Sequence, residues 1–141
     1  MPFLSELKKI IFNKIKNYFK IHSDKNINFI KERPSDFKFV SWSNILKKEG
    51  YNVPHIHPSG WVSGVFYLKV PNKIKENEAG IQFHLNGDDY EIINQNMPNK
   101  TIKPDVGTLV FFPSSLFHST VPFSSDEERI CIAFDLCGIK N

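Results

Sequence analysis

Three histidines and one arginine have the side-chain types and spacing that could support chemistry. His55 and His57 lie one residue apart, just before a β-rich run, and His118 lies on a later predicted strand. Neutral imidazole is the commonest protein ligand for first-row metal ions. Because residues i and i+2 of a strand point to the same face, His55 and His57 can share one ion. The pattern predicts a metal site, with iron as the candidate ion.

Arg129, eleven residues beyond His118, predicts an anion site beside the metal. Its planar guanidinium pairs two nitrogens with two carboxylate oxygens and stays charged at any relevant pH. Two or three imidazoles on one side of an ion leave positions open for dioxygen and for an organic acid that binds through two atoms. We expect Arg129 to hold the far carboxylate of such an acid.

Length and composition bound the class of protein. The 141 residues, 40% hydrophobic and with thirteen Phe, fit one globular domain with one core. No apolar stretch approaches the roughly twenty residues of a membrane span. Charges at Glu6, Lys8 and Lys9 interrupt any secretory signal, so we expect a cytoplasmic protein. The net charge of +3 comes from scattered lysines, which does not indicate nucleic-acid binding.

The two cysteines, Cys131 and Cys137, are too few for a zinc site, which needs about four ligands. We expect them to be buried thiols near the end of a strand, as is usual for an intracellular chain.

The elements that must position the site are one helix and about eight strands. Apolar residues recur every three or four positions over 3–19, which predicts an amphipathic helix packed across the back of a sheet. Past Pro34 the pattern changes to strands punctuated by Gly, Pro and Asn. The predicted strands cover 37–46, 55–57, 62–70, 80–85, 107–112, 117–123 and 129–136, with a weak strand at 90–93 in a polar loop over 86–104.

Short strands with regular turns predict a mainly β sandwich or barrel. We expect a single domain over 1–141, with an N-terminal helical segment at 1–33 and a β core at 37–137.

Three blocks in the last hundred residues resemble the 2-oxoglutarate- and Fe(II)-dependent oxygenases. They are His55-Ile-His-Pro-Ser-Gly-Trp-Val-Ser-Gly-Val-Phe-Tyr-Leu68, Pro104-Asp-Val-Gly-Thr-Leu-Val-Phe-Phe-Pro-Ser-Ser-Leu-Phe-His118 and Glu128-Arg-Ile-Cys-Ile-Ala-Phe-Asp135. They occur in the family's order, which makes the resemblance specific. It implies a double-stranded β-helix, a cupin-like jelly-roll with the metal between its two sheets. It also implies a hydroxylase that uses Fe(II), 2-oxoglutarate and O2 to couple oxidative decarboxylation of 2-oxoglutarate to C–H oxidation of an unidentified substrate.

The resemblance also implies roles for single residues. His55 becomes the proximal iron ligand and His118 the distal one, and Arg129 becomes the clamp for the side-chain carboxylate of 2-oxoglutarate. Tyr67 would give that carboxylate a hydroxyl hydrogen bond, and Ser63 is a weaker candidate for the same pocket.

Position 57 departs from the family's usual pattern, because most members have Asp or Glu where this chain has His57. Two alternatives follow. His57 is a third nitrogen ligand, which its shared orientation with His55 favours. Otherwise two histidines hold the ion alone, as in the aspartyl/asparaginyl β-hydroxylases, whose His-x-Gly-Pro block is similar to His-Ile-His-Pro here.

Trp42 and Asn44, two apart on the first predicted strand, would face one side together and line the cavity.

One rival function is a cupin-type metalloprotein, an isomerase or a dioxygenase that does not use 2-oxoglutarate. That rival leaves Arg129 without a role and lacks the Glu that usually follows the histidine pair. The other is a non-enzymatic jelly-roll binding module in which the histidines only pack.

Overall fold

The fold consists of two helices and seven strands in the part of the chain that a computed structural model describes, residues 2–72 and 74–139. The elements are α1 (Pro2–Ile21), α2 (Asn28–Lys31), β1 (Phe37–Leu46), β2 (Val62–Lys69), β3 (Ile81–His84), β4 (Lys100–Ile102), β5 (Leu109–Pro113), β6 (Phe117–Thr120) and β7 (Arg129–Gly138).

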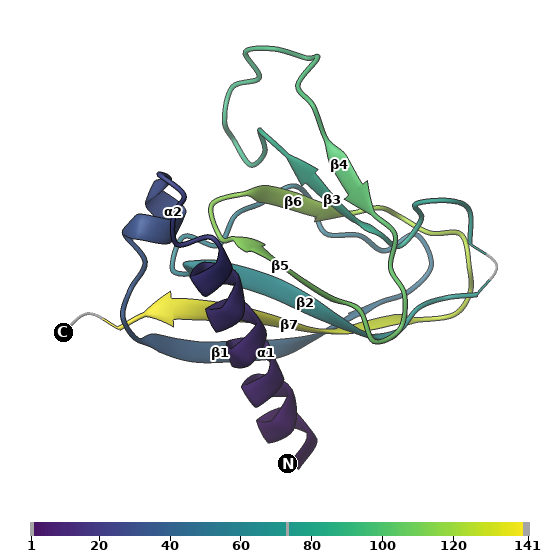
Figure 1. Cartoon of the computed structure of the whole chain (residues 1–141). Helices are drawn as coiled ribbons and strands as arrows, with labels where there is room; N and C mark the ends of the chain where they lie inside the picture. The colour runs from purple at the N-terminus through teal and green to yellow at the C-terminus, as the bar shows by residue number, and fades with distance from the viewer. Residues whose placement is uncertain (1, 73, 140–141) are drawn as a thin grey trace.

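Two antiparallel sheets form a sandwich (Figure 1). The larger sheet has the strand order β1-β7-β2-β5 and the smaller one β4-β3-β6. The long central strand β7 pairs with β1 from Phe37 opposite Gly138 to Leu46 opposite Arg129, and with β2 on its other edge. The mainly β sandwich predicted from the sequence is confirmed.

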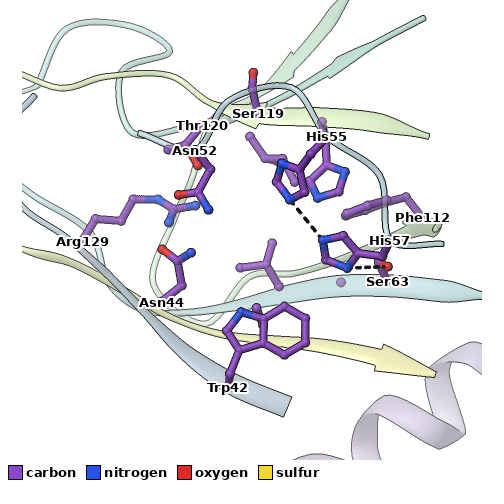
Figure 2. Close-up of a pocket in the computed structure, with 15 residues that line it drawn as sticks. Trp42, Asn44, Asn52, His55, His57, Ser63, Phe112, Ser119, Thr120 and Arg129 are labelled. Carbon is purple, nitrogen blue, oxygen red and sulfur yellow. Dashed lines mark hydrogen bonds between the residues drawn. The ribbon is translucent and has the colours of Figure 1, made fainter. Parts of the chain in front are cut away.

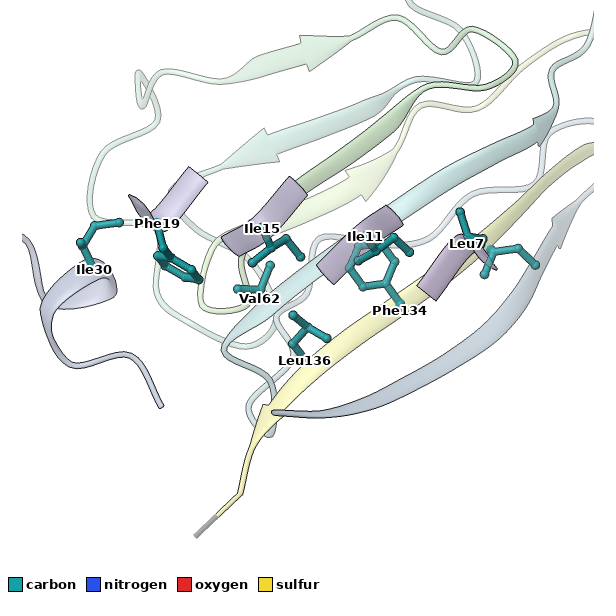
Figure 3. Close-up of a cluster of buried hydrophobic side chains, with 9 residues drawn as sticks. Leu7, Ile11, Ile15, Phe19, Ile30, Val62, Phe134 and Leu136 are labelled. Carbon is teal, nitrogen blue, oxygen red and sulfur yellow. The ribbon is translucent and has the colours of Figure 1, made fainter. Parts of the chain in front are cut away.

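Helix α1 crosses the outer face of the larger sheet, on the side away from β3, β4 and β6 (Figure 1). Its buried residues are Leu7, Ile11, Ile15 and Phe19, which follow one another at spacings of four. Residues spaced this way share one face of a helix. They pack against side chains of the sheet, including Val62, Phe134 and Leu136 (Figure 3). The predicted amphipathic helix is therefore confirmed, together with its packing on a sheet.

A second, smaller cluster of buried residues fills the space between the two sheets. It contains Val65 and Tyr67 of β2, Ile81 of β3, Phe112 of β5 and Cys131 of β7. Each fully buried apolar side chain contributes about 1.5–3 kcal/mol to folding by leaving water. The two clusters lie on opposite faces of the larger sheet, which fixes its position between α1 and the smaller sheet.

Two predicted strands differ from the structure. Residues 55–57 form only a single bridge, between His55 and His118. Pro54 and Pro58 flank this segment, and proline has no N–H to extend a ladder. The weak strand at 90–93 is wrong: the segment is irregular, and Ile93 is 88% exposed. Tyr90 and Ile92 are also exposed, so no apolar face of this segment is buried, and strand β4 forms later in the same predicted loop.

Both cysteines are free thiols near the larger sheet's central strand. Cys131 is buried and Cys137 half-buried, and burial raises the pKa of the Cys131 thiol to about 11. A thiol that stays protonated is a poor nucleophile.

Within residues 2–72 and 74–139, neither helix combines the length and the apolar character needed to cross a membrane.

Candidate active site

The three histidines meet between the two sheets although they come from distant parts of the chain. The backbone N–H of His55 donates to the carbonyl of His118 at 3.1 Å, and the N–H of His118 donates to the carbonyl of His55 at 3.1 Å. The N–H of His57 donates to the carbonyl of Ser114 at 3.0 Å. These backbone bonds hold the segment before β2 against β6.

The imidazole rings form a compact triangle. The ring centroids lie 4.4 Å apart for His55 and His118, 5.0 Å for His57 and His118, and 5.1 Å for His55 and His57. One nitrogen of each ring lies within 4.8 Å of the others. Three nitrogens at this separation can bind one first-row metal ion from one side. The geometry thus brings His57 to the same place as the other two histidines.

Hydrogen bonds at Nδ1 leave Nε2 of each ring available to a metal ion. The acceptors of the three Nδ1 atoms are Val53 O for His55 at 2.6 Å, Asp135 Oδ1 for His57 at 2.7 Å and Leu116 O for His118 at 3.0 Å. An acceptor at Nδ1 fixes the tautomer that carries its proton there, so Nε2 keeps its lone pair. The Nε2 atoms of His55 and His57 lie 3.1 Å apart (Figure 2). A shared cation would remove the repulsion between two such lone pairs.

His118 is the most deeply buried of the three ligand candidates, with 7% of its surface exposed. Burial lowers the pKa of its imidazole to about 4, while the backbone carbonyl of Leu116 opposes the shift and the neighbouring His55 and His57 add to it. The ring therefore stays neutral at physiological pH, which is the form that binds a metal ion.

Arg129 is buried at the start of β7, with 3% of its surface exposed. Its Nε donates to the carbonyl of Ala79 at 2.9 Å, and its Nη2 donates to the Tyr67 hydroxyl at 3.3 Å. The guanidinium carbon also lies 5.0 Å from the centre of the Tyr67 ring. No carboxylate pairs with Arg129 among the described residues. A buried cation without a counter-ion is costly, so this site suits an anionic ligand.

A single cavity of about 80 Å³ joins the histidines to Arg129. Figure 2 shows Arg129 on one side of it and His55 and His57 on the other. The volume is several times the roughly 10–15 Å³ that one water molecule needs. The oxygen Oδ1 of Asn44 is buried here without a hydrogen-bond partner in residues 2–72 and 74–139. An unsatisfied polar atom indicates that the cavity accommodates a polar ligand or water.

The other expected site residues lie at different depths. Trp42 and Asn44 both line the cavity, and the Trp42 ring is 5.6 Å from the ring of His57. Tyr67 is fully buried behind Arg129, and burial raises the pKa of its hydroxyl. Ser63 lines the cavity on the side of His57, where its hydroxyl lies 3.2 Å from Nδ1.

Two residues that the sequence analysis did not single out contact the site. Asp135 ends the third sequence block and accepts the hydrogen bond from His57. Strand alternation could have indicated it, because residues 129, 131, 133 and 135 share one face. Ala79 holds Arg129 through a backbone carbonyl, and its φ of 60° lies in the left-handed region. No side-chain pattern signals a backbone contact of this kind.

Comparison with solved structures establishes the fold family. The chain is similar to a Pseudomonas putida prolyl-4-hydroxylase (17% identity, TM-score 0.56, 72% of this chain and 54% of that one). It is also similar to an oxidoreductase of the 2OG-Fe(II) oxygenase family from Burkholderia pseudomallei (14%, 0.57, 78% and 47%). A third similar structure is the viral collagen prolyl hydroxylase of Paramecium Bursaria Chlorella virus-1 in its 2OG complex (18%, 0.56, 94% and 74%). The chain therefore has the double-stranded β-helix fold of these oxygenases.

The chain spans about half the length of the first two of these structures, 54% and 47%. No curated protein sequence matches it. The sequence model of one family, described as "Putative 2OG-Fe(II) oxygenase", matches residues 40–135. This range runs from within β1 to within β7 and includes all three histidines and Arg129. This chain belongs to that family of 2-oxoglutarate- and Fe(II)-dependent oxygenases.

Proposed function

We propose that the protein is a 2-oxoglutarate- and Fe(II)-dependent dioxygenase that hydroxylates a C–H bond of its substrate. One observation carries the proposal: three imidazoles and a buried guanidinium line the same cavity, and no carboxylate of residues 2–72 and 74–139 pairs with that guanidinium. Neither rival function explains both features together. A cupin-type site leaves Arg129 without a ligand, and a binding module needs no three converging Nε2 atoms.

His55, His57 and His118 would hold the iron through Nε2. The donor set fits, because all three rings have an acceptor at Nδ1 and nitrogen ligands suit Fe(II). When bound, Fe(II) supplies the redox chemistry that couples the decarboxylation of 2-oxoglutarate by O2 to oxidation of a C–H bond.

Arg129 would bind the far carboxylate of 2-oxoglutarate with its guanidinium fork. The carbonyl of Ala79 and the Tyr67 hydroxyl occupy its Nε and Nη2, which orients the remaining N–H groups. Tyr67 would act by supporting Arg129, and its hydroxyl hydrogen remains free to reach a bound carboxylate.

Apolar side chains would limit the access of water to the bound co-substrates. Val65, Ile81 and Phe112 line the cavity between the two sheets, and the ring of Phe112 lies 4.6 Å from the ring of His118. A site that performs oxidation benefits from such a lining, because it protects reactive species from side reactions.

We also propose that the protein works in a reducing compartment, the cytoplasm. Both cysteines are free, which suits a compartment that keeps thiols reduced.

An anaerobic titration tests the proposed function. The purified protein loaded with Fe(II) should develop a weak visible charge-transfer band when 2-oxoglutarate is added, because the acid binds the iron directly. The band should be absent with either component alone. Folded protein that binds Fe(II) and 2-oxoglutarate without any such band would contradict the proposal.

A further inference from the structure

Asp135 lies directly behind His57, on the side of the ring that faces away from the other two histidines. Its Oδ1 accepts a hydrogen bond from His57 Nδ1 at 2.7 Å and another from the Ser63 hydroxyl at 2.6 Å. The side chain of Asp135 is 13% exposed and that of His57 is 17% exposed. This pair joins residues 78 positions apart in the chain.

When Asp135 is a carboxylate, donor and acceptor can be assigned in only one way for the hydrogen bonds around it. A carboxylate only accepts, so Ser63 gives its proton to Asp135. The Ser63 oxygen is then free to accept from the Ser114 hydroxyl, 2.8 Å away. Both serines are about 1% exposed. Ser63 and His57 therefore both donate to Asp135, and Ser114 donates to Ser63.

Close packing holds this chain of hydrogen bonds in place. A Cβ atom added at Gly60 would lie 2.4 Å from the Ser114 hydroxyl and 3.5 Å from the carboxyl carbon of Asp135. Separations under about 3 Å are far inside van der Waals contact. Only glycine at position 60 therefore leaves room for the Ser114 side chain in this arrangement, while the contact with Asp135 is an ordinary one.

We propose that Asp135 is a positioning residue that holds His57 in the tautomer with its proton on Nδ1, so that Nε2 faces the metal. The inference rests on the proposed function and deepens it. Position 57 lacks the carboxylate that most of the superfamily uses as an iron ligand, and three imidazoles bring no negative charge. Asp135 places a carboxylate one hydrogen bond behind His57, where it fixes the orientation of the imidazole.

The tautomer of His57 can be measured without any metal. In nitrogen-15 NMR spectra of the metal-free protein, His57 should carry its proton on Nδ1. Asp135→Ala removes the acceptor at 2.7 Å and leaves only the Ser63 hydroxyl, 3.2 Å from Nδ1, so His57 should then populate both tautomers. A His57 ring that keeps a single Nδ1–H tautomer in the folded Asp135→Ala variant, or that carries its proton on Nε2 in the wild type, would overturn the inference.

Metal affinity gives the second readout, measured by calorimetric titration with Co(II). Losing a partner of this kind typically lowers metal affinity about 10–100-fold, which is the loss expected for Asp135→Ala. Asp135→Asn keeps the volume and one oxygen acceptor but removes the charge, so we expect a smaller, several-fold loss. Asp135→Asn also provides the test of metal affinity if Asp135→Ala does not fold. The exposed Asp105→Asn is the matched control and should bind Co(II) like the wild type.

A double variant separates positioning from a general change in charge. If Asp135 acts through His57, the loss caused by Asp135→Asn should shrink in the His57→Ala background. Equal losses in both backgrounds would overturn the inference. Failure of the wild type to bind Co(II) would instead contradict the proposed function, and the tautomer of the metal-free protein would still test the role of Asp135.

Discussion

The two faces of strand β7 differ in composition. Ile132, Phe134 and Leu136 belong to the apolar cluster under α1, whereas Arg129 and Asp135 contact the proposed active site on the other face. Side chains alternate along a strand, so one stretch of chain supplies both sets. The apolar residues on the helix-covered face therefore stabilise the fold. The polar groups on the inner face cost stability when they are buried, and they serve binding.

The largest expected effect is on the helix-covered face. Phe134 is fully buried and stacks on Phe39 with ring centroids 5.7 Å apart. Phe134→Ala should lower the free energy of unfolding by about 3–5 kcal/mol, because it leaves a cavity between α1 and the sheet. Urea unfolding measures this loss. Co(II) affinity of the folded variant should stay within twofold of the wild type, and a collapse of that affinity would contradict the division between the faces.

On the inner face, stability should depend on pH through His118. Its pKa is lowered from 6.5 to about 4 in the folded, metal-free protein. As pH falls below about 6.5, the unfolded chain takes up a proton that folded His118 does not, so stability is lost between about pH 6.5 and 4. The loss from this group should be about 3 kcal/mol at pH 4.

Urea unfolding of the metal-free protein at pH 7.5 and pH 4 checks this expectation. His118→Gln, whose side chain cannot titrate at position 118, is the control. Between pH 7.5 and pH 4 its free energy of unfolding should fall by about 3 kcal/mol less than that of the wild type. Identical pH dependence of the two proteins would show that burial of His118 carries no such cost.

Replacing Arg129 should separate binding from stability. Arg129→Met keeps much of the side-chain volume but removes the charge and the fork, so 2-oxoglutarate affinity should fall about a hundredfold. The free energy of unfolding should be unchanged or higher, because a buried cation without a counter-ion is lost. Calorimetry with 2-oxoglutarate and with Co(II) makes the comparison. Equal losses of affinity for both would place Arg129 among the groups that hold the metal site.

The smallest effect is expected for Tyr67→Phe. The variant removes one acceptor of the Arg129 guanidinium and leaves the ring that packs beside it. Loss of a single hydrogen bond costs about 1 kcal/mol, which corresponds to roughly fivefold weaker binding of 2-oxoglutarate. Calorimetry measures the change, and the exposed Tyr51→Phe serves as the control. Unchanged affinity would show that Tyr67 does not support Arg129.

Regular periodicity explains which elements could be predicted from the sequence. The helix over 3–19 could be predicted because its apolar residues recur every three or four positions. The strand over 37–46, predicted between Pro34 and a turn near Gly50, has the same bounds as β1 in the structure. The predicted strand at 90–93 was wrong, because its apolar residues, including both isoleucines, are largely exposed in the structure.

The candidate site could be predicted from spacing within one block of sequence and from the order of the three blocks. His55 and His57 could be paired from their spacing, and the order of the blocks added His118 and Arg129. Strand alternation could have placed Asp135 on the same face of β7 as Arg129, but its contact with His57 could not be predicted, because that contact depends on how β7 pairs with β2. The contact between Arg129 and the carbonyl of Ala79 could not be predicted either, because it is made by the backbone.

The central claim is that the three histidines and Arg129 form one site, so metal and 2-oxoglutarate should bind with positive coupling. Calorimetric titration of 2-oxoglutarate into the wild-type protein, with and without bound Co(II), tests it most directly. We predict at least about tenfold tighter binding with the metal present, and by thermodynamic linkage the same factor for Co(II) when 2-oxoglutarate is bound. Equal affinity for 2-oxoglutarate with and without the metal would contradict the claim.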